Sequence, residues 1–365
     1  MRIAVRGRPL LLAAAVGGVF LLSVFAAGAI GDRFTAPLGP GLGLPTPTPV
    51  ALAASVGVTA SPSGGAISAT PLATAEPAPL CGGPPTMVVL GIGADSRADN
   101  YLYGLADAIR VARVDFRVPA VSVLTLPRDL WVEIPGISDH YGITHGKLNQ
   151  AYLYGNPGLG YYDGPGAGPG LLARTLDHNF GLRVDHYGAI NMRTFVRLVD
   201  AVGGIDLTLD QPVDGRPVDD KTEDMGYFPA GPHHMDGETA LRFSRIRKAD
   251  NAFRRDDRQT QVLCALKDKL LSPAVIPQIP EIVAAFRDSI LTDLSPAQLA
   301  SLACLGPLVA PENLRFASIP EELLVGTRNA EGSFVLETDP QAMRALVADF
   351  LAGAWPSEPN QPSCP

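Results

Sequence analysis

The stretch "TMVVLGIG", Thr86–Gly93, decides how this chain folds. It is a short apolar run that ends in glycine, a pattern typical of a buried strand that delivers a loop. The next two runs, "AIRVARVDF" and "AVSVLTLP", also predict strands. The first alternates, and Pro127 ends the second. "WVEIP" predicts a short fourth strand. The folded region therefore begins with several strands that are close in sequence.

Helical patterns follow these strands. "NMRTFVRLVDAVGG" predicts a helix with one apolar face, formed by Phe195, Leu198, Val199 and Val202. Gly203 and Gly204 supply its C-terminal cap, and "IDLTL" predicts the next strand. "DGETALRF" predicts a helix capped by Asp236, and "RDDRQTQVLCALKDKLL" predicts a long amphipathic helix. Strands mixed with helices in this order indicate α/β layers around one sheet.

Residues 273–365 have a different character. "SPAVIPQIPEIVAAF", "SPAQLASLACLG" and "DPQAMRALVADFLAG" predict helices, two of them behind proline starts. We find no chemical motif in this region. We therefore expect a main domain over residues 86–272, followed by a C-terminal helical extension that packs on it or follows it.

The N-terminus predicts a membrane anchor. Arg2, Arg6 and Arg8 precede the uncharged run Pro9–Gly31, and about 20 apolar residues are needed to cross the hydrocarbon core as a helix. Positive charge before the span favours a cytoplasmic N-terminus and places the remainder outside the membrane. A cleaved signal peptide is the alternative, because "AAGA" offers small residues for cleavage. We expect residues 1–31 to form a cytoplasmic tip and one transmembrane helix.

Residues 32–85 predict a linker. "PTPTP", "SPSGG" and "TAEPAPL" are rich in Pro, Thr, Ala and Gly, with almost no aromatic residues. Such a composition buries too little apolar surface to offset the entropy of ordering. We expect a disordered, semi-extended tether that holds the folded domain away from the membrane surface.

The four cysteines are Cys81, Cys264, Cys304 and Cys364, and none forms a CxxC pair, so a zinc site is not expected. An even number of cysteines in an exported domain suggests disulfides. The sequence does not fix how they pair. One hypothesis joins Cys81 to Cys364, which flank the folded region, and Cys264 to Cys304. Buried free thiols are the alternative.

Arginine is concentrated in "RFSRIRKADNAFRRDDRQ", within a chain whose formal net charge is −8. The acidic balance argues against nucleic-acid binding, which needs an extended basic surface. Arg245 and Arg247 would share one face of a strand, and Arg255 and Gln259 one side of a helix. Guanidinium groups match phosphate oxygens bidentately, so their convergence predicts a di- or polyanionic ligand such as a pyrophosphate. A solvated helix with internal ion pairs is the alternative.

Further charged residues follow the predicted strands. "GADSR" supplies Arg97, "LPRD" supplies Arg128 and Asp129, and "LADA" places Asp107 just before a strand. Strand ends are where α/β sheets build ligand sites. Mg²⁺ is commonly held by one or two carboxylates together with substrate phosphates, and Asp107 and Asp129 suit that role. The sequence thus predicts a magnesium site, with Mn²⁺ as the alternative ion.

The ordered set "DSR", "LPRD", "KLNQAYLYG", "NMRTFVRLVDAVGGIDL", "HHMDGETALRFSRIR" and "RRDDRQ" resembles the LytR-CpsA-Psr family over roughly Thr86–Leu271. The resemblance implies an α/β/α sandwich around a central mixed sheet, with a pocket for a polyprenyl chain. It implies that Asp107 and Asp129 bind the metal. It also implies a pyrophosphate-binding set, which comprises Arg97, Arg128, Lys147, Arg245, Arg247, Arg255 and Gln259. The glycine-rich "GNPGLGYYDGPGAGPG", Gly155–Gly170, is a local loop elaboration near this site.

The resemblance also implies an activity. Family members are phosphotransferases at the outer face of the bacterial membrane. They move a glycopolymer from a polyprenyl-pyrophosphate carrier to a peptidoglycan hydroxyl, with Mg²⁺. By position, Asp107, Asp129, Arg128 and Arg245 would carry catalysis in this sequence. Two alternatives stay open: a protein that binds polyprenyl phosphates without transfer, and a phosphatase that hydrolyses the carrier pyrophosphate.

Overall fold

The computed structural model describes residues 39–44, 77–96, 101–220, 222–247, 252–275 and 289–355, with the single positions 278, 282, 286 and 364. At its centre is a six-stranded mixed sheet in the order β11-β6-β1-β2-β3-β12. Its strands are β1 (Thr86–Ala94), β2 (Ala106–Asp115), β3 (Ala120–Leu126), β6 (His186–Asn191), β11 (Leu291–Thr292) and β12 (Leu314–Ser318). β1, β2 and β3 are antiparallel neighbours, whereas β6 is parallel to β1 and β12 is parallel to β3. The predicted strands from Thr86 to Leu126 are therefore confirmed.

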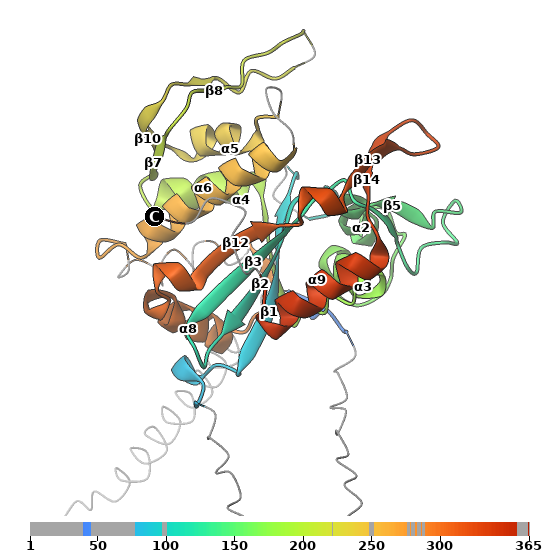
Figure 1. The fold of residues 1–365 in the computed structure, drawn as a ribbon, viewed down its shortest axis with the longest axis horizontal. Helices are drawn as coiled ribbons and strands as arrows, with labels where there is room; N and C mark the ends of the chain where they lie inside the picture. The colour runs from blue at the N-terminus through green and yellow to red at the C-terminus, as the bar shows by residue number, and fades with distance from the viewer. Residues whose placement is uncertain are drawn as a thin grey trace, which may run out of the picture.

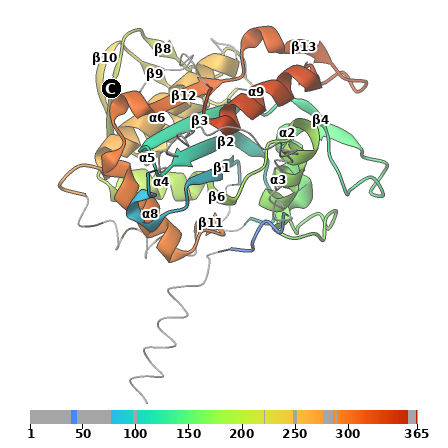
Figure 2. The same ribbon diagram turned by 60° about the horizontal axis from the view of Figure 1, so that its bottom comes forward.

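Helices cover both faces of this sheet (Figures 1 and 2). One face carries α2 (Leu148–Gly155), α3 (Ala167–Phe180) and α9 (Pro340–Ala352), whose apolar residues share the largest core cluster with the strands. The other face carries α4 (Met192–Ala201), α5 (Gly237–Arg245) and α6 (Ala252–Leu270), which form a second cluster with strand β7 (Ile205–Leu209). Each helix buries one apolar stripe, which accounts for the layered arrangement.

Helix caps lie where the sequence places them. Asp236 accepts a hydrogen bond from the Thr239 amide at 2.8 Å and so starts α5. Gly203 and Gly204 follow α4 with φ angles of 78° and 81°, a backbone conformation that glycine adopts without strain. "WVEIP" and "IDLTL" do form strands, but they lie outside the central sheet. β4 (Trp131–Glu133) pairs with β5 (His145–Lys147), and β7 pairs with β10 (Gly231–Met235).

Residues after 273 contribute strands as well as the predicted helices. α8 (Pro296–Leu305) and α9 are present, and the helix expected from Ser272 falls largely outside the described residues. β11 and β12, however, form the two edges of the central sheet. β12 reads "LRFAS", five residues whose partner β3 lies far away in sequence, so local patterning did not indicate it. Shorter pairs complete the fold: β8 (Val213–Asp214) with β9 (Tyr227–Phe228), and β13 (Val325–Arg328) with β14 (Phe334–Glu337).

Two parts of the predicted linker are packed on the domain rather than free. Leu42 is 4% exposed and belongs to the main core, and Leu80–Gly82 forms a short 3₁₀ turn bonded to Phe116. The burial of Leu42 helps to offset the entropic cost of ordering its segment. The predicted anchor, residues 1–31, lies outside the described residues. Within the described ranges, no helix combines the length and apolarity needed to cross a membrane.

The disulfides pair differently from our hypothesis. Cys81 is bonded to Cys304, and Cys264 to Cys364. The hypothesis was wrong because it paired Cys81 with Cys364 from their positions at the two ends of the folded region. The fold instead brings η1 (Leu80–Gly82) against α8. The second bond joins the middle of α6 to the C-terminal end of the chain.

We predict that replacing Cys264 and Cys364 together by serine destabilises the domain by about 2–5 kcal/mol, because the bond closes a long loop in the unfolded chain. Guanidinium unfolding measures this loss. Peptide mapping without reductant should recover Cys81 joined to Cys304, and a peptide that joins Cys81 to Cys364 would contradict the pairing.

Candidate active site

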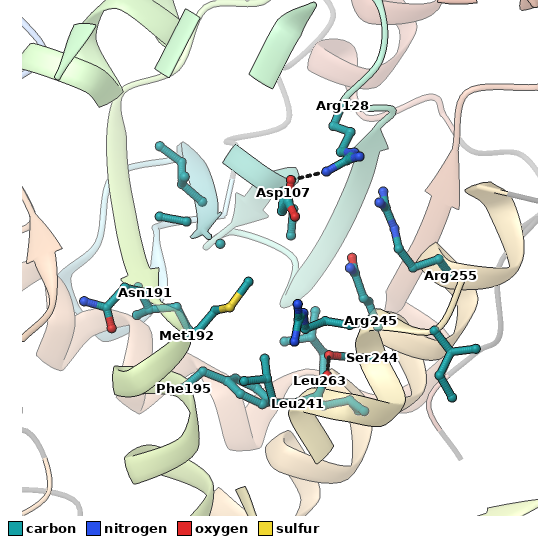
Figure 3. Close-up of a pocket in the computed structure, with 18 of the residues that line it drawn as sticks. Asp107, Arg128, Asn191, Met192, Phe195, Leu241, Ser244, Arg245, Arg255 and Leu263 are labelled. Atoms are coloured by element: carbon teal, nitrogen blue, oxygen red, sulfur yellow. Dashed lines mark hydrogen bonds and ion pairs between the residues drawn. The ribbon is translucent and has the colours of Figure 1, made fainter. Parts of the chain in front are cut away.

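A cavity of about 700 Å³ lies between the central sheet and the layer of α4, α5 and α6 (Figure 3). Glycines on β1 and β6 (Gly91, Gly93 and Gly188) form part of its sheet side, where the missing side chains leave space. Toward β6 and β11 the lining is mostly apolar and includes Ile190, Met192, Phe195 and Ile290. Toward β2 and β3 the lining is charged. The cavity therefore has an apolar end and a polar end.

The polar end gathers arginines from four separate segments. Arg110 comes from β2, Arg128 follows β3, Arg245 ends α5, Arg247 follows it, and Arg255 lies in the first turns of α6. Gln259, one helical turn after Arg255, also lines the cavity. Two carboxylates, Asp107 and Glu223, are the acids among these lining residues, so the polar end keeps an excess of positive charge.

Arg245 and Arg247 reach the cavity by a different route from the predicted one. They do not share a strand: Arg245 is the last residue of α5, and Ile246 leaves the helix with a ψ of 131°. A two-residue spacing at a helix end resembles strand alternation, which explains the wrong assignment. The carbonyl of Ile246 accepts a hydrogen bond from the buried Arg258, so α6 holds the turn that presents both arginines.

Arg255 is 5% exposed, and its Nε is a buried donor without a hydrogen-bond partner in the described part of the chain. Its Nη2 lies 3.2 Å from Asp256 Oδ1, and Figure 3 shows the side chain extending toward the other cavity arginines. Burial, together with the charges of Arg255 and Arg128, lowers the pKa of Arg247 to about 10. This crowding of like charge favours an anion between the guanidinium groups.

Asp107 faces the cavity because β2 bulges there. The register of β1 and β2 shifts between Gly93 and Ala94, whose partners are Ala108 and Ala106, so Asp107 has no cross-strand partner. Such bulges re-aim a side chain. Asp107 pairs with Arg128 and lies 3.7 Å from Arg247 (Figure 3).

Asp129 and Lys147 do not line the cavity. Lys147 Nζ donates to Asp129 Oδ1 at 2.7 Å, and Arg128 Nε lies 3.4 Å from Asp129 Oδ2. Burial would raise the pKa of Asp129, but the hydrogen bond from Lys147 and the charge of Arg128 lower it below its ordinary value. Asp129 thus orients Arg128 from outside the cavity, whereas Asp107 is part of the cavity lining.

The predicted metal ligands are therefore placed unequally. Asp107 presents a carboxylate to the cavity, which fits a cation shared with ligand phosphates. Asp129 does not line the cavity, although each of the two acids is paired with two cationic side chains. Among the described residues, no group of three or more His, Cys, Asp or Glu side chains could hold a metal ion by itself.

One predicted site residue cannot be placed, and one residue of the cavity was not predicted. Arg97 lies outside the described residues. Arg110 was missed, although it is 8% exposed and lines the cavity. Its guanidinium donates to Thr125 Oγ1 at 2.9 Å and to the Asp256 carbonyl at 3.0 Å, which ties β2 and β3 to the start of α6. An arginine flanked by Ile109 and Val111 in a buried strand was the available signal.

Several named transferases resemble this chain in sequence. It is 32% identical over 216 residues to "Polyisoprenyl-teichoic acid--peptidoglycan teichoic acid transferase TagU" of Enterococcus faecalis, covering 58% of this chain and 62% of that protein. It is 28% identical over 208 residues to the corresponding transferase TagV of Bacillus subtilis, covering 56% of this chain and 49% of that protein. The matches thus span about half to three-fifths of the relatives' length.

The fold agrees with solved structures, and a family model covers most of the chain. B. subtilis TagV superposes with a TM-score of 0.57 at 23% identity, over 73% of this chain and 97% of that one. TagT bound to LIIa-WTA superposes with a TM-score of 0.52 at 21% identity, over 73% and 90% of the two chains. The LytR_cpsA_psr family model matches residues 80–348. The chain therefore belongs to the LytR-CpsA-Psr family.

Proposed function

We propose that this chain is an extracytoplasmic phosphotransferase that moves a glycopolymer from a polyprenyl-pyrophosphate carrier to a hydroxyl of peptidoglycan. The observation that carries the proposal is the two-ended cavity, apolar toward β6 and β11 and rich in arginine toward β2 and α6. A polyprenyl pyrophosphate has the same two halves, an apolar chain and a polyanionic head. The transferases that resemble this chain are named for polyisoprenyl-linked teichoic acid and peptidoglycan.

The arginines have a defined part in the proposed step. Arg128, Arg245, Arg247 and Arg255 hold the pyrophosphate oxygens by charge-assisted hydrogen bonds, and Gln259 adds a neutral contact. The acceptor oxygen forms a bond to the phosphorus next to the glycan. The bond from that phosphorus to the bridging oxygen breaks, and polyprenyl phosphate leaves with the electron pair. The acceptor hydroxyl releases its proton to solvent water, and a glycan phosphodiester results.

Catalysis of this step depends on positioning and on stabilising charge. Arg110 and Arg258 fix the backbone segments that present Arg255, Arg245 and Arg247, so the guanidinium groups need little reorganisation. We propose Mg²⁺ as the cofactor, with Mn²⁺ as the alternative, held by Asp107 and the substrate phosphates. When bound, the ion would neutralise charge on the phosphate oxygens. Asp129 would act mainly by holding Arg128 and Lys147.

The proposed location follows from the sequence outside the described residues. The basic tip and the apolar run Pro9–Gly31 would form a single-pass anchor with the N-terminus in the cytoplasm. The catalytic domain would then face the membrane-bound carrier and the wall from outside.

Product analysis tests the reaction itself. We expect the protein, incubated with a polyprenyl-pyrophosphate-linked glycan, peptidoglycan oligomers and Mg²⁺, to give glycan joined to peptidoglycan through a phosphodiester. Mass spectrometry detects this product. Phosphate release without the joined product would point instead to a phosphatase, and lipid binding without any product would point to a binding protein.

Two arginines of α5 provide a matched pair of variants. Arg245 lines the cavity, whereas Arg242 is exposed and hydrogen-bonds to Thr239 on its own helix. We expect Arg245→Ala to lower the transfer rate by about 100-fold or more, the scale on which loss of one preorganised charge donor acts. Arg242→Ala should stay within about twofold, with both circular dichroism spectra unchanged. Equal rates for the two variants would remove Arg245 from the site.

The two acids should differ in their response to metal. Asp107→Asn leaves a cavity-facing oxygen but removes its charge, so we expect half-maximal transfer to require at least about tenfold more Mg²⁺. Asp129→Asn removes the partner of Lys147 and Arg128, and should lower the rate at every Mg²⁺ concentration without a comparable shift. A Mg²⁺ titration of both variants measures this difference, and a larger shift for Asp129→Asn would reverse the assignment.

A further inference from the structure

The segment "GPGLGL", Gly39–Leu44, is bound to the domain far ahead of the first strand; we call it the strap. Leu42 is 4% exposed and packs in the main core. Tyr187 Oη donates to the Pro40 carbonyl at 3.0 Å, and Arg174 Nη2 donates to the Gly43 carbonyl at 3.4 Å. The strap is thus held by an apolar side chain and by hydrogen bonds to its backbone.

The surface that receives the strap is the end of the glycine-rich loop. A Cβ atom at Gly43 would lie 2.4 Å from the Pro165 side chain, and Gly43 also has a φ of +59°. A Cβ atom at Gly166 would lie 3.1 Å from the Cα of Leu42. Both partners therefore need glycine to approach this closely. The glycine-rich segment Gly155–Gly170 therefore binds the strap, and it does not line the cavity.

The strap meets the domain at the β6 and β11 side of the sheet, on the face that carries α3, whereas the cavity lies on the opposite face. A Cβ atom at Gly39 would lie 2.7 Å from Tyr187 Oη on β6 and 3.0 Å from the Thr292 carbonyl on β11. The neighbouring residues Gly188 and Ile290 line the cavity. Figure 2 shows the strap, in blue, close to β11 and α3. Two of the cavity arginines lie farther across the sheet, Arg110 on β2 and Arg128 after β3.

We propose that the strap is an attachment point that holds the domain close to the membrane. The inference rests on the proposed function and on the predicted anchor. Eight peptide links separate Gly31 from Gly39, and an extended chain of that length spans at most about 29 Å. Without the strap, 49 links would lead from Gly31 to Leu80, a reach of about 170 Å.

A short attachment would make the carrier lipid easier for the domain to reach. A domain on a short attachment stays near the bilayer that contains the carrier lipid. A domain on the full tether would sample a much larger volume and many orientations. The strap therefore gives the domain a short attachment in place of the long flexible spacer that composition alone suggested.

Energy transfer on the full-length chain in lipid vesicles tests this. A dye is attached to Ala300→Cys, an exposed position on α8, and acceptor dyes are placed on lipid headgroups. α8 lies beside β6, where Gln298 Nε2 is 2.7 Å from His186 Nε2. The strap variant is Gly43→Val. Its matched control is Gly41→Val, because a Cβ atom at Gly41 would meet nothing within 4 Å.

We expect Gly43→Val to lower the transfer efficiency to about half or less, because the longer tether moves the domain outward. Gly41→Val should match the parent chain. If Gly43→Val also lowers the melting temperature of the domain, Leu42→Ser provides a second, independent release of the strap. Equal transfer in the parent and the strap variants would overturn the inference, as would failure of the full-length chain to stay with the vesicles.

The distance measurement needs no turnover, so it separates this inference from the proposed reaction. A domain held close to vesicles but without transferase activity would sustain the strap and reject the phosphotransferase. If both hold, Gly43→Val should slow transfer from a vesicle-embedded donor by about fivefold or more, yet leave transfer from a short-chain, water-soluble donor unchanged.

Discussion

Burying guanidinium groups of like charge beside an apolar cavity is the constraint on which the rest of the structure depends. An arginine removed from water without a partner is strongly unfavourable, and here Arg255 keeps a buried Nε that no described side chain satisfies. The fold meets this demand with backbone carbonyls and a few acids. Arg110 bonds to the Asp256 carbonyl, Arg258 to the Ile246 carbonyl, and Asp129 holds Arg128. The charge that remains uncompensated faces the cavity, where an anionic ligand would complete it.

The C-terminal region holds α6 in place. Cys364 is bonded to Cys264 in α6, the helix that carries Arg255 and Gln259. Both cysteines pack with Phe316 of β12 and Val123 of β3. A region without chemical motifs of its own therefore fixes the helix that presents the chemical groups. β11 and β12 also pair with β6 and β3, so that these two strands lie inside the sheet and not at its edges.

Local rules predicted those features whose causes are local. The Asp236 cap, the long helix after it and the i,i+4 pair of Arg255 and Gln259 depend on neighbours within one or two turns. The disulfide pairing, β12 and the separation of Lys147 from the cavity depend on contacts between distant segments, which periodicity does not encode. Asp107 shows the limit most clearly, since a one-residue bulge in β2 decides whether its carboxylate meets the cavity. The residue type was predictable, but its direction was not.

In the linker, composition correctly indicated a segment without a core of its own, but it did not predict that residues 39–44 pack on the domain. A proline- and glycine-rich segment cannot form a core of its own. It can still add one apolar side chain to an existing core, and Leu42 does so. Glycine lowers the steric cost of that contact on both sides, because Gly43 and Gly166 allow the two backbones to approach. Low-complexity composition therefore predicts weak self-association of a segment, but it does not predict how the segment behaves beside a preformed surface of matching shape. A strap so short and rich in glycine gains its stability from the receiving loop, so its sequence can be understood only together with residues 155–170.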